Sequence, residues 1–102
     1  MAELEVDPQR ADELRGEGAR VVDVRRDDEW AAGRIEGAEH LPLDQLAARA
    51  EELGEGPIVF YCAVGERSLM AAQALAGADR EAVSLAGGIA AWQQAGLPVT
   101  TE

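Results

Sequence analysis

The stretch of sequence that decides the fold reads Ile58-Val59-Phe60-Tyr61-Cys62-Ala63-Val64-Gly65-Glu66-Arg67-Ser68. Its first five residues form a continuous apolar run, which is typical of a strand in the middle of a parallel sheet. From Arg67 to Ala76 the sequence predicts a helix that is apolar nearly all round, so we expect this helix to be well buried. The stretch therefore predicts a buried strand, a loop and a helix, with Cys62 at the carboxyl end of the strand.

Short apolar runs alternate with helical patterns along the rest of the chain. The apolar runs predict strands at residues 4–6, 20–24, 38–41, 58–62 and 82–85, of which 82–85 is the last strand of the chain. The helical patterns cover residues 7–15, 27–32, 44–53, 67–76 and 89–95. Asp7 and Pro8 begin the first helix as its N-cap and first helical residue, and Asp27 with Asp28 caps the second.

This alternation over short connections implies an α/β fold, with a parallel sheet covered by helices on both faces. A length of 102 residues is enough for one small core, so we expect residues 1–102 to form a single domain. Folds of this kind bind ligands beyond the carboxyl ends of their strands. Cys62 occupies such a position.

The composition argues against several classes of function. The formal net charge is -11 and all nine basic residues are arginine, so nucleic acid and anionic membranes are poor partners. A single cysteine excludes an internal disulfide and a zinc site built from several cysteines. There is no apolar run long enough to span a membrane and no signal peptide at Met1, so we expect a soluble cytoplasmic protein.

Three features of the loop favour a thiolate at Cys62. The following helix begins with unpaired N–H groups and the positive end of its dipole. Gly65 lets the backbone curl so that successive N–H groups point inward and bind an anion. Arg67 adds a fixed positive charge. Together they predict a lowered pKa for Cys62 and a cradle for a sulfur-bearing anion.

The loop also leaves alternatives open. We expect Ser68 to cap the helix, and the alternative is that its hydroxyl joins the cradle. For Cys62 the alternative is a buried cysteine that does no chemistry, with Arg67 as a solvated surface residue.

Loop length separates two chemistries that use a cysteine at this position. Cys62 and Arg67 frame a Cys-x4-Arg loop, which resembles the active loop of rhodaneses. Cysteine-dependent phosphatases have a Cys-x5-Arg loop that holds a tetrahedral phosphate. Here Ser68 stands where a phosphatase would need its arginine, and Tyr61 stands where many have histidine. The spacing and the single cysteine therefore disfavour a phosphatase or an arsenate reductase.

Two further segments resemble rhodanese signatures. One consists of Val22-Asp23-Val24-Arg25, Glu29-Trp30 and the run from Gly33 to Pro42; the other runs from Leu85-Ala86-Gly87-Gly88 through Ala91-Trp92 to Gly96-Leu97-Pro98. With the cysteine loop between them, they cover about residues 20 to 99 in the family's order. The resemblance implies a three-layer α/β/α fold with five mainly parallel strands and helices on both faces.

The resemblance also implies an enzyme, a sulfurtransferase. A donor such as thiosulfate, or a protein persulfide, passes its outer sulfur to Cys62, and cyanide or a cellular thiol then removes it. Cys62 and Arg67 would be the catalytic residues, and the substrate-binding residues would be Ala63, Val64, Gly65, Glu66 and Ser68. No metal or organic cofactor is needed. The implied partners are a small sulfur-containing anion and a sulfur donor or acceptor protein.

Residues outside the loop are expected to support it. Asp23 and Arg25 lie at the end of the second strand. We expect them to have a structural role, in which they pair and brace the loop; the alternative is that they face the cleft. Gly87 and Gly88 are expected to let the last helix start close to the active loop. Packing or other structural roles are expected for Trp30, His40 and Trp92.

Glu66 departs from the rhodanese pattern by placing a negative charge inside the loop, which disfavours a dianionic donor. Arg34 stands where the family usually has a histidine, and we interpret this difference as a substitution on the protein surface. The alternative function is therefore a rhodanese-fold sulfur carrier or regulatory binding module, loaded by a partner protein and slow with small donors. A catalytically silent domain is opposed by the presence of both Cys62 and Arg67.

Overall fold

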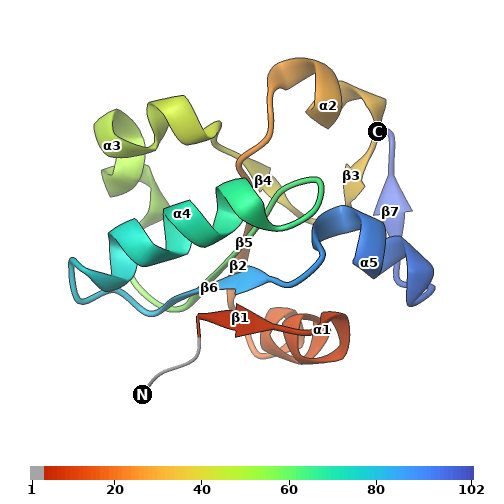
Figure 1. The fold of residues 1–102 in the computed structure, drawn as a ribbon, viewed down its shortest axis with the longest axis horizontal. Helices are drawn as coiled ribbons and strands as arrows, with labels where there is room; N and C mark the ends of the chain where they lie inside the picture. The colour runs from red at the N-terminus through yellow and green to blue at the C-terminus, as the bar shows by residue number, and fades with distance from the viewer. Residues whose placement is uncertain (1–3) are drawn as a thin grey trace.

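A computed structural model describes residues 4–102 as a five-stranded parallel sheet between two layers of helices (Figure 1). The strand order is β1-β6-β5-β2-β4, and every neighbouring pair is parallel. The strands are β1 (Glu5–Val6), β2 (Arg20–Asp23), β4 (Glu39–His40), β5 (Ile58–Tyr61) and β6 (Ala82–Leu85). The predicted α/β architecture with five parallel strands is therefore confirmed.

Helices cover both faces of the sheet because side chains along each strand point alternately to opposite faces. On one face, Val22 and Phe60 pack with the helices on the α3 and α4 side, and on the other, Val21 and Val59 pack with those on the α1 and α5 side. The helical segments are α1 (Pro8–Gly16), α2 (Asp27–Ala32), α3 (Leu46–Arg49) flanked by the 3-10 turns η1 (Leu43–Gln45) and η2 (Ala50–Leu53), α4 (Glu66–Ala76) and α5 (Gly88–Gln94).

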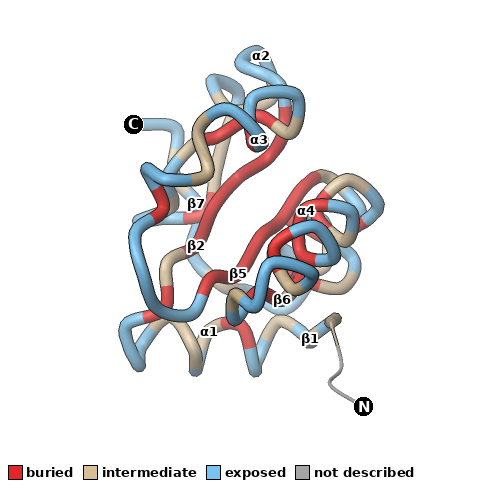
Figure 2. Tube along the Cα trace, turned by 90° about the vertical axis from the view of Figure 1, so that its left-hand side faces the viewer, coloured by how far each residue is buried: buried red, intermediate tan, exposed pale blue. Residues whose placement is uncertain are grey.

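The centre of the sheet is the pair β5 and β2, whose buried course is visible in Figure 2. All four residues of β5 are buried, as the apolar run predicted. Asp23 is in register with Tyr61, and the Val24 N–H donates to the Tyr61 carbonyl at 3.0 Å. The ends of β2 and β5 therefore lie side by side, and the residues that follow each strand meet at the same edge.

Two short strands were not predicted from the sequence. β3 (Arg34–Ile35) and β7 (Val99–Thr100) pair antiparallel in a separate sheet, so 82–85 is not the last strand. Each has two residues, of which only one is apolar, so neither strand showed an apolar run in the sequence.

Two expectations about helices are wrong in detail. The N-cap of α2 is Arg26, and Asp27 with Asp28 lies in the first turn, where the helix dipole favours negative charge. α4 is buried on one side only, through Ser68, Ala71, Ala72 and Leu75, whereas Met70 is 59% exposed. α4 lies on the outside of the sheet, so one of its faces meets solvent although its sequence is apolar.

Among residues 4–102, none of the helices combines the length and apolar character needed to cross a lipid bilayer. The expectation of no leader peptide at Met1 concerns residues outside the described range.

The start of α5 lies against the active loop, and Gly88 makes this contact possible. The Ile89 N–H donates to the Cys62 carbonyl at 2.9 Å. Gly88 has φ +62°, and a Cβ at this position would lie 2.5 Å from the carbonyl carbon of Ala63. Gly87 is also close, since a Cβ on Gly65 would come within 3.3 Å of its nitrogen. The expected close approach of the two glycines to the loop is therefore confirmed.

Gly88→Ala should lower the free energy of unfolding by about 3 kcal/mol, because a left-handed backbone costs an alanine roughly 1–2 kcal/mol and forced overpacking costs roughly 1–3 kcal/mol. Urea unfolding followed by circular dichroism measures this. Gly16→Ala is the matched control, since a Cβ on Gly16 in α1 meets nothing within 4 Å. Equal stability of the two variants would contradict the close approach.

Candidate active site

The sulfur of Cys62 lies inside the loop that joins β5 to α4. The residue is 1% exposed. Its Sγ accepts hydrogen bonds from the Gly65 N–H at 3.1 Å and the Ser68 N–H at 3.4 Å, and it lies 3.5 Å from the Ser68 hydroxyl. Gly65 is the N-cap of α4 and has a left-handed backbone, φ +105°, which bends the chain around the sulfur. The loop therefore surrounds one sulfur atom with hydrogen-bond donors.

These donors favour the thiolate. Burial raises the pKa of Cys62, but hydrogen bonds from the Ser68 hydroxyl and from the amides of Ser68, Gly65 and Val64 outweigh it, so the pKa is lowered from its ordinary value. A lowered pKa increases the fraction of nucleophilic thiolate near neutral pH. The arrangement can therefore perform nucleophilic chemistry without a separate base.

Ser68 does not cap α4, contrary to expectation. It lies in the first turn of the helix, after the N-cap Gly65, and is fully buried. Its Oγ is 2.7 Å from the Oγ of Ser84, a buried residue of β6 that the sequence analysis missed. When the Ser84 hydroxyl donates to Ser68, the proton of Ser68 is left for one of two acceptors, the Cys62 sulfur at 3.5 Å or the Gly65 carbonyl at 3.3 Å. A serine within an otherwise apolar strand was the sequence signal for Ser84.

Arg67 faces a carboxylate rather than standing alone in the loop. Its two terminal nitrogens contact the two oxygens of Glu29 in α2, at 2.7 and 3.0 Å. Glu29 also accepts from the Arg26 N–H at 3.1 Å. Hydrogen bonding to Arg67, more than any other contact, lowers the pKa of Glu29 to about 2, so the pair is charged throughout the neutral range. In the sequence, Glu29 stood out only as part of a family motif, and its contact with Arg67 was not predicted.

Asp23 and Arg25 form a buried ion pair at the end of β2, as the pairing expectation requires. Their side chains are 0% and 8% exposed, and Arg25 Nη2 lies 2.7 Å from Asp23 Oδ2. The same nitrogen donates to the Gly33 carbonyl at 2.6 Å. Burial alone would lower the pKa of Arg25, but the Asp23 carboxylate outweighs it and the pKa is raised. Arg25 thus braces the end of α2 against the sheet.

The other predicted structural residues pack as expected. His40 and Trp30 stack with ring centroids 4.8 Å apart, and His40 Nε2 lies 2.8 Å from the Arg25 carbonyl oxygen. Trp92 is buried and donates to the Pro98 carbonyl at 2.9 Å.

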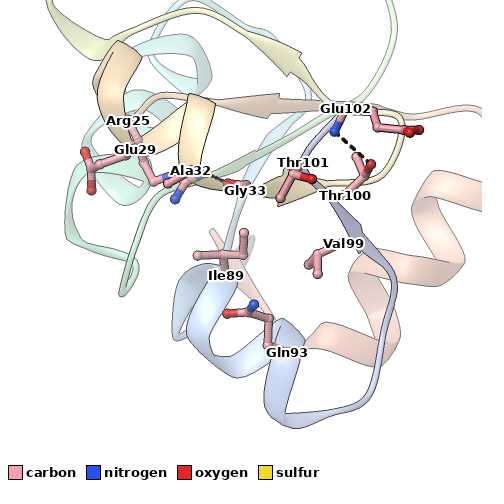
Figure 3. Close-up of a pocket in the computed structure, with 10 residues that line it drawn as sticks. All are labelled: Arg25, Glu29, Ala32, Gly33, Ile89, Gln93, Val99, Thr100, Thr101 and Glu102. Atoms are coloured by element: carbon pink, nitrogen blue, oxygen red, sulfur yellow. Dashed lines mark hydrogen bonds between the residues drawn. The ribbon is translucent and has the colours of Figure 1, made fainter.

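Two cavities lie beside the charged residues Arg25, Glu29 and Arg67. One, of about 530 Å³, has Arg25 and Glu29 on one side and Ile89 with Gln93 of α5 on another (Figure 3). The second, of about 620 Å³, is lined by Arg25, Arg26 and Arg67 together with residues of α2 and η1. Cys62 lines neither of them. The side chains of Val64 and Glu66 are exposed, so these residues contribute backbone to the loop and turn their side chains to solvent.

Comparison with known proteins identifies relatives along nearly the whole chain. The family model of the Rhodanese-like domain matches residues 7–95. The chain is 38% identical over 92 residues to the thiosulfate sulfurtransferase GlpE of Ectopseudomonas mendocina, covering 86% of this chain and 83% of that protein. It is 43% identical over 83 residues to an HTH-type transcriptional regulator of Mycobacterium tuberculosis, covering 78% of this chain but only 36% of the regulator.

A solved structure shares the fold. The rhodanese-related protein from Thermoplasma volcanium has a TM-score of 0.89 and 27% sequence identity, covering 96% of this chain and 98% of that one.

Ser68→Ala should raise the pKa of Cys62, because it removes a hydroxyl that stabilises the thiolate. The pH dependence of alkylation by iodoacetamide, which reports the thiolate, should move its midpoint to higher pH. Ser84→Ala removes an equally buried hydroxyl that does not touch Sγ, and its midpoint should move less. An unchanged midpoint in Ser68→Ala would show that the backbone amides suffice.

Proposed function

This chain belongs to the rhodanese-like family, and we propose that it is a sulfurtransferase in which Cys62 carries the transferred sulfur as a persulfide. The observation that carries the proposal is the set of N–H and O–H donors around the Cys62 sulfur. The likeness to proteins named thiosulfate sulfurtransferase supports the same reaction class.

The reaction proceeds by two substitutions at sulfur. The Cys62 thiolate attacks the outer sulfur of the donor, a new S–S bond forms, and the donor's bond breaks with its electron pair on the leaving group, which is sulfite when the donor is thiosulfate. An acceptor, cyanide or a thiolate, then attacks the outer sulfur, and Cys62 leaves as a thiolate. A low cysteine pKa favours both steps, because the same sulfur is first nucleophile and then leaving group.

The loop backbone suits the intermediate. The terminal sulfur of a persulfide is an anion, and we expect it to be held by N–H groups of the loop, as the thiolate is held by those of Gly65 and Ser68. Arg67 would act at the edge of this cradle. Asp23 and Arg25 would take no part in the chemistry, and their ion pair would fix the end of β2 beside the loop.

A second candidate is a sulfur carrier loaded by a partner protein. It is favoured by the exposed Glu66, by the pairing of Arg67 with Glu29 and by the net charge of -11, all of which weaken attraction for a small dianion. This candidate uses the same persulfide but predicts slow turnover of thiosulfate.

Intact mass measured before and after incubation with thiosulfate tests the proposal, with Cys62→Ser as the control. We expect a gain of one sulfur atom that is lost on adding cyanide and is absent in the variant. No gain with thiosulfate, but a gain with mercaptopyruvate and its sulfurtransferase or with another protein persulfide, would favour the carrier. No gain from any sulfane donor would overturn both.

A further inference from the structure

The three arginines around the active loop are each paired with a carboxylate. Arg25 pairs with Asp23 and Arg26 with Asp28. Arg67, the nearest to Cys62 in sequence, pairs with Glu29. These are the three arginines that line the cavity of about 620 Å³, so each arginine charge in its lining is compensated by a carboxylate.

The Arg67–Glu29 pair is the one best placed to act on Cys62. Its side chains are 32% and 19% exposed, whereas those of Arg26 and Asp28 are 69% and 72% exposed and therefore more strongly screened by water. Arg67 also precedes Ser68, which touches the Cys62 sulfur through its N–H and its hydroxyl. Glu29 raises the pKa of Arg67 most, and the Cys62 thiolate raises it further, so Arg67 and the sulfur are within range of each other's charge.

The charge state of this pair matters most for donors that are themselves charged. For any two unit charges roughly 8 Å apart, at an effective dielectric between surface and bulk values, Coulomb's law gives an attraction that changes a rate or affinity by about threefold. The effect on a dianion is the square of this, about tenfold. A neutral reagent is unaffected.

We propose that Glu29 is a positioning residue that compensates the charge of Arg67, and that it thereby selects against dianionic donors such as thiosulfate in favour of donors carrying less charge, such as the persulfide of a thiol. This inference rests on the proposed sulfur transfer for its biological meaning. Its electrostatic content is measurable without any sulfur transfer.

The test is the ratio of the rates at which iodoacetate and iodoacetamide alkylate Cys62 in the whole protein. The two reagents are nearly the same size and both need the thiolate, so burial and pKa cancel in the ratio. Glu29→Gln keeps the shape and can still accept from the Arg26 N–H, but removes the negative charge. It should raise the ratio about threefold at low ionic strength, and added salt should reduce the gain.

Glu52→Gln is the matched control. Like Glu29, Glu52 accepts two hydrogen bonds from one arginine, here Arg49, at 2.9 and 3.0 Å. It lies in η2, which leads into the start of β5, at the opposite end of the strand from Cys62. The change in net charge is the same, and the alkylation ratio should stay at its original value. Equal ratios in the two variants would overturn the proposal.

Steady-state kinetics with thiosulfate then separates positioning from a merely structural role. Glu29→Gln should lower the KM for thiosulfate about tenfold and leave kcat nearly unchanged. A fall in kcat with an unchanged alkylation ratio would mean that Glu29 orients Arg67 for the chemistry, and the proposal would be wrong. A changed ratio without any sulfur transfer would overturn the proposed function but leave the electrostatic role intact.

Arg67→Gln provides a second variant in case Glu29→Gln does not fold. It leaves Glu29 without its partner, so the net charge beside the loop becomes negative and the alkylation ratio should fall about threefold. An unchanged ratio would overturn the proposal, because it would show that neither charge reaches Cys62.

Discussion

The pairing of β2 with β5 is the constraint on which the rest of the site depends. The register sets Asp23 beside Tyr61, and the ladder continues past the strand ends through the hydrogen bond from Val24 to Tyr61. Beyond this edge, β2 leads into α2 and β5 leads into the cysteine loop. Glu29 and Arg67, which are 38 residues apart in sequence, therefore meet without any long segment having to be ordered for the purpose.

Burying a thiolate is unfavourable, and the fold offsets this with donors that are already fixed. An unpaired charge in a poorly solvated place costs far more than a paired one. Here the amides of Gly65 and Ser68 are held by the first turn of α4, and the Ser68 hydroxyl is held by Ser84. α5 donates to the Cys62 carbonyl from the other side. The donors are thus ordered by helices and strands that form for other reasons, so little reorganisation is needed when charge develops on the sulfur.

Most of the fold was predictable because its signals are local. The apolar run of β5, the cap at Asp7 and the glycines that end helices each depend on a few neighbouring residues, and the side chain of Asp7 does accept from the Arg10 N–H. The loop was predictable for the same reason, since strand end, glycine and helix start are contiguous. The pairing of β3 with β7 was not, because neither strand lies in an apolar run and the two are more than sixty residues apart. The partners of Arg67 and Ser68 are also distant in sequence, so the sequence identified these residues but not what they contact.

From the sequence, the loop as a whole was expected to stabilise the thiolate and to attract the donor. In the structure these two roles belong mainly to different residues. Arg67 was expected to stabilise the thiolate, and its charge does interact with that of the sulfur, but the contacts that most lower the pKa of Cys62 come from Ser68 and from backbone amides. Those donors act at hydrogen-bond distance and carry no net charge, so they stabilise the sulfur strongly while extending little field outside the loop. The Arg67–Glu29 pair acts over a longer range and bears on what approaches. Because the larger contributions come from different atoms, substitutions at Ser68 act mainly on the reactivity of the cysteine, and substitutions at the Arg67–Glu29 pair act mainly on its preference among charged donors. Both leave the strand pairing beneath them intact.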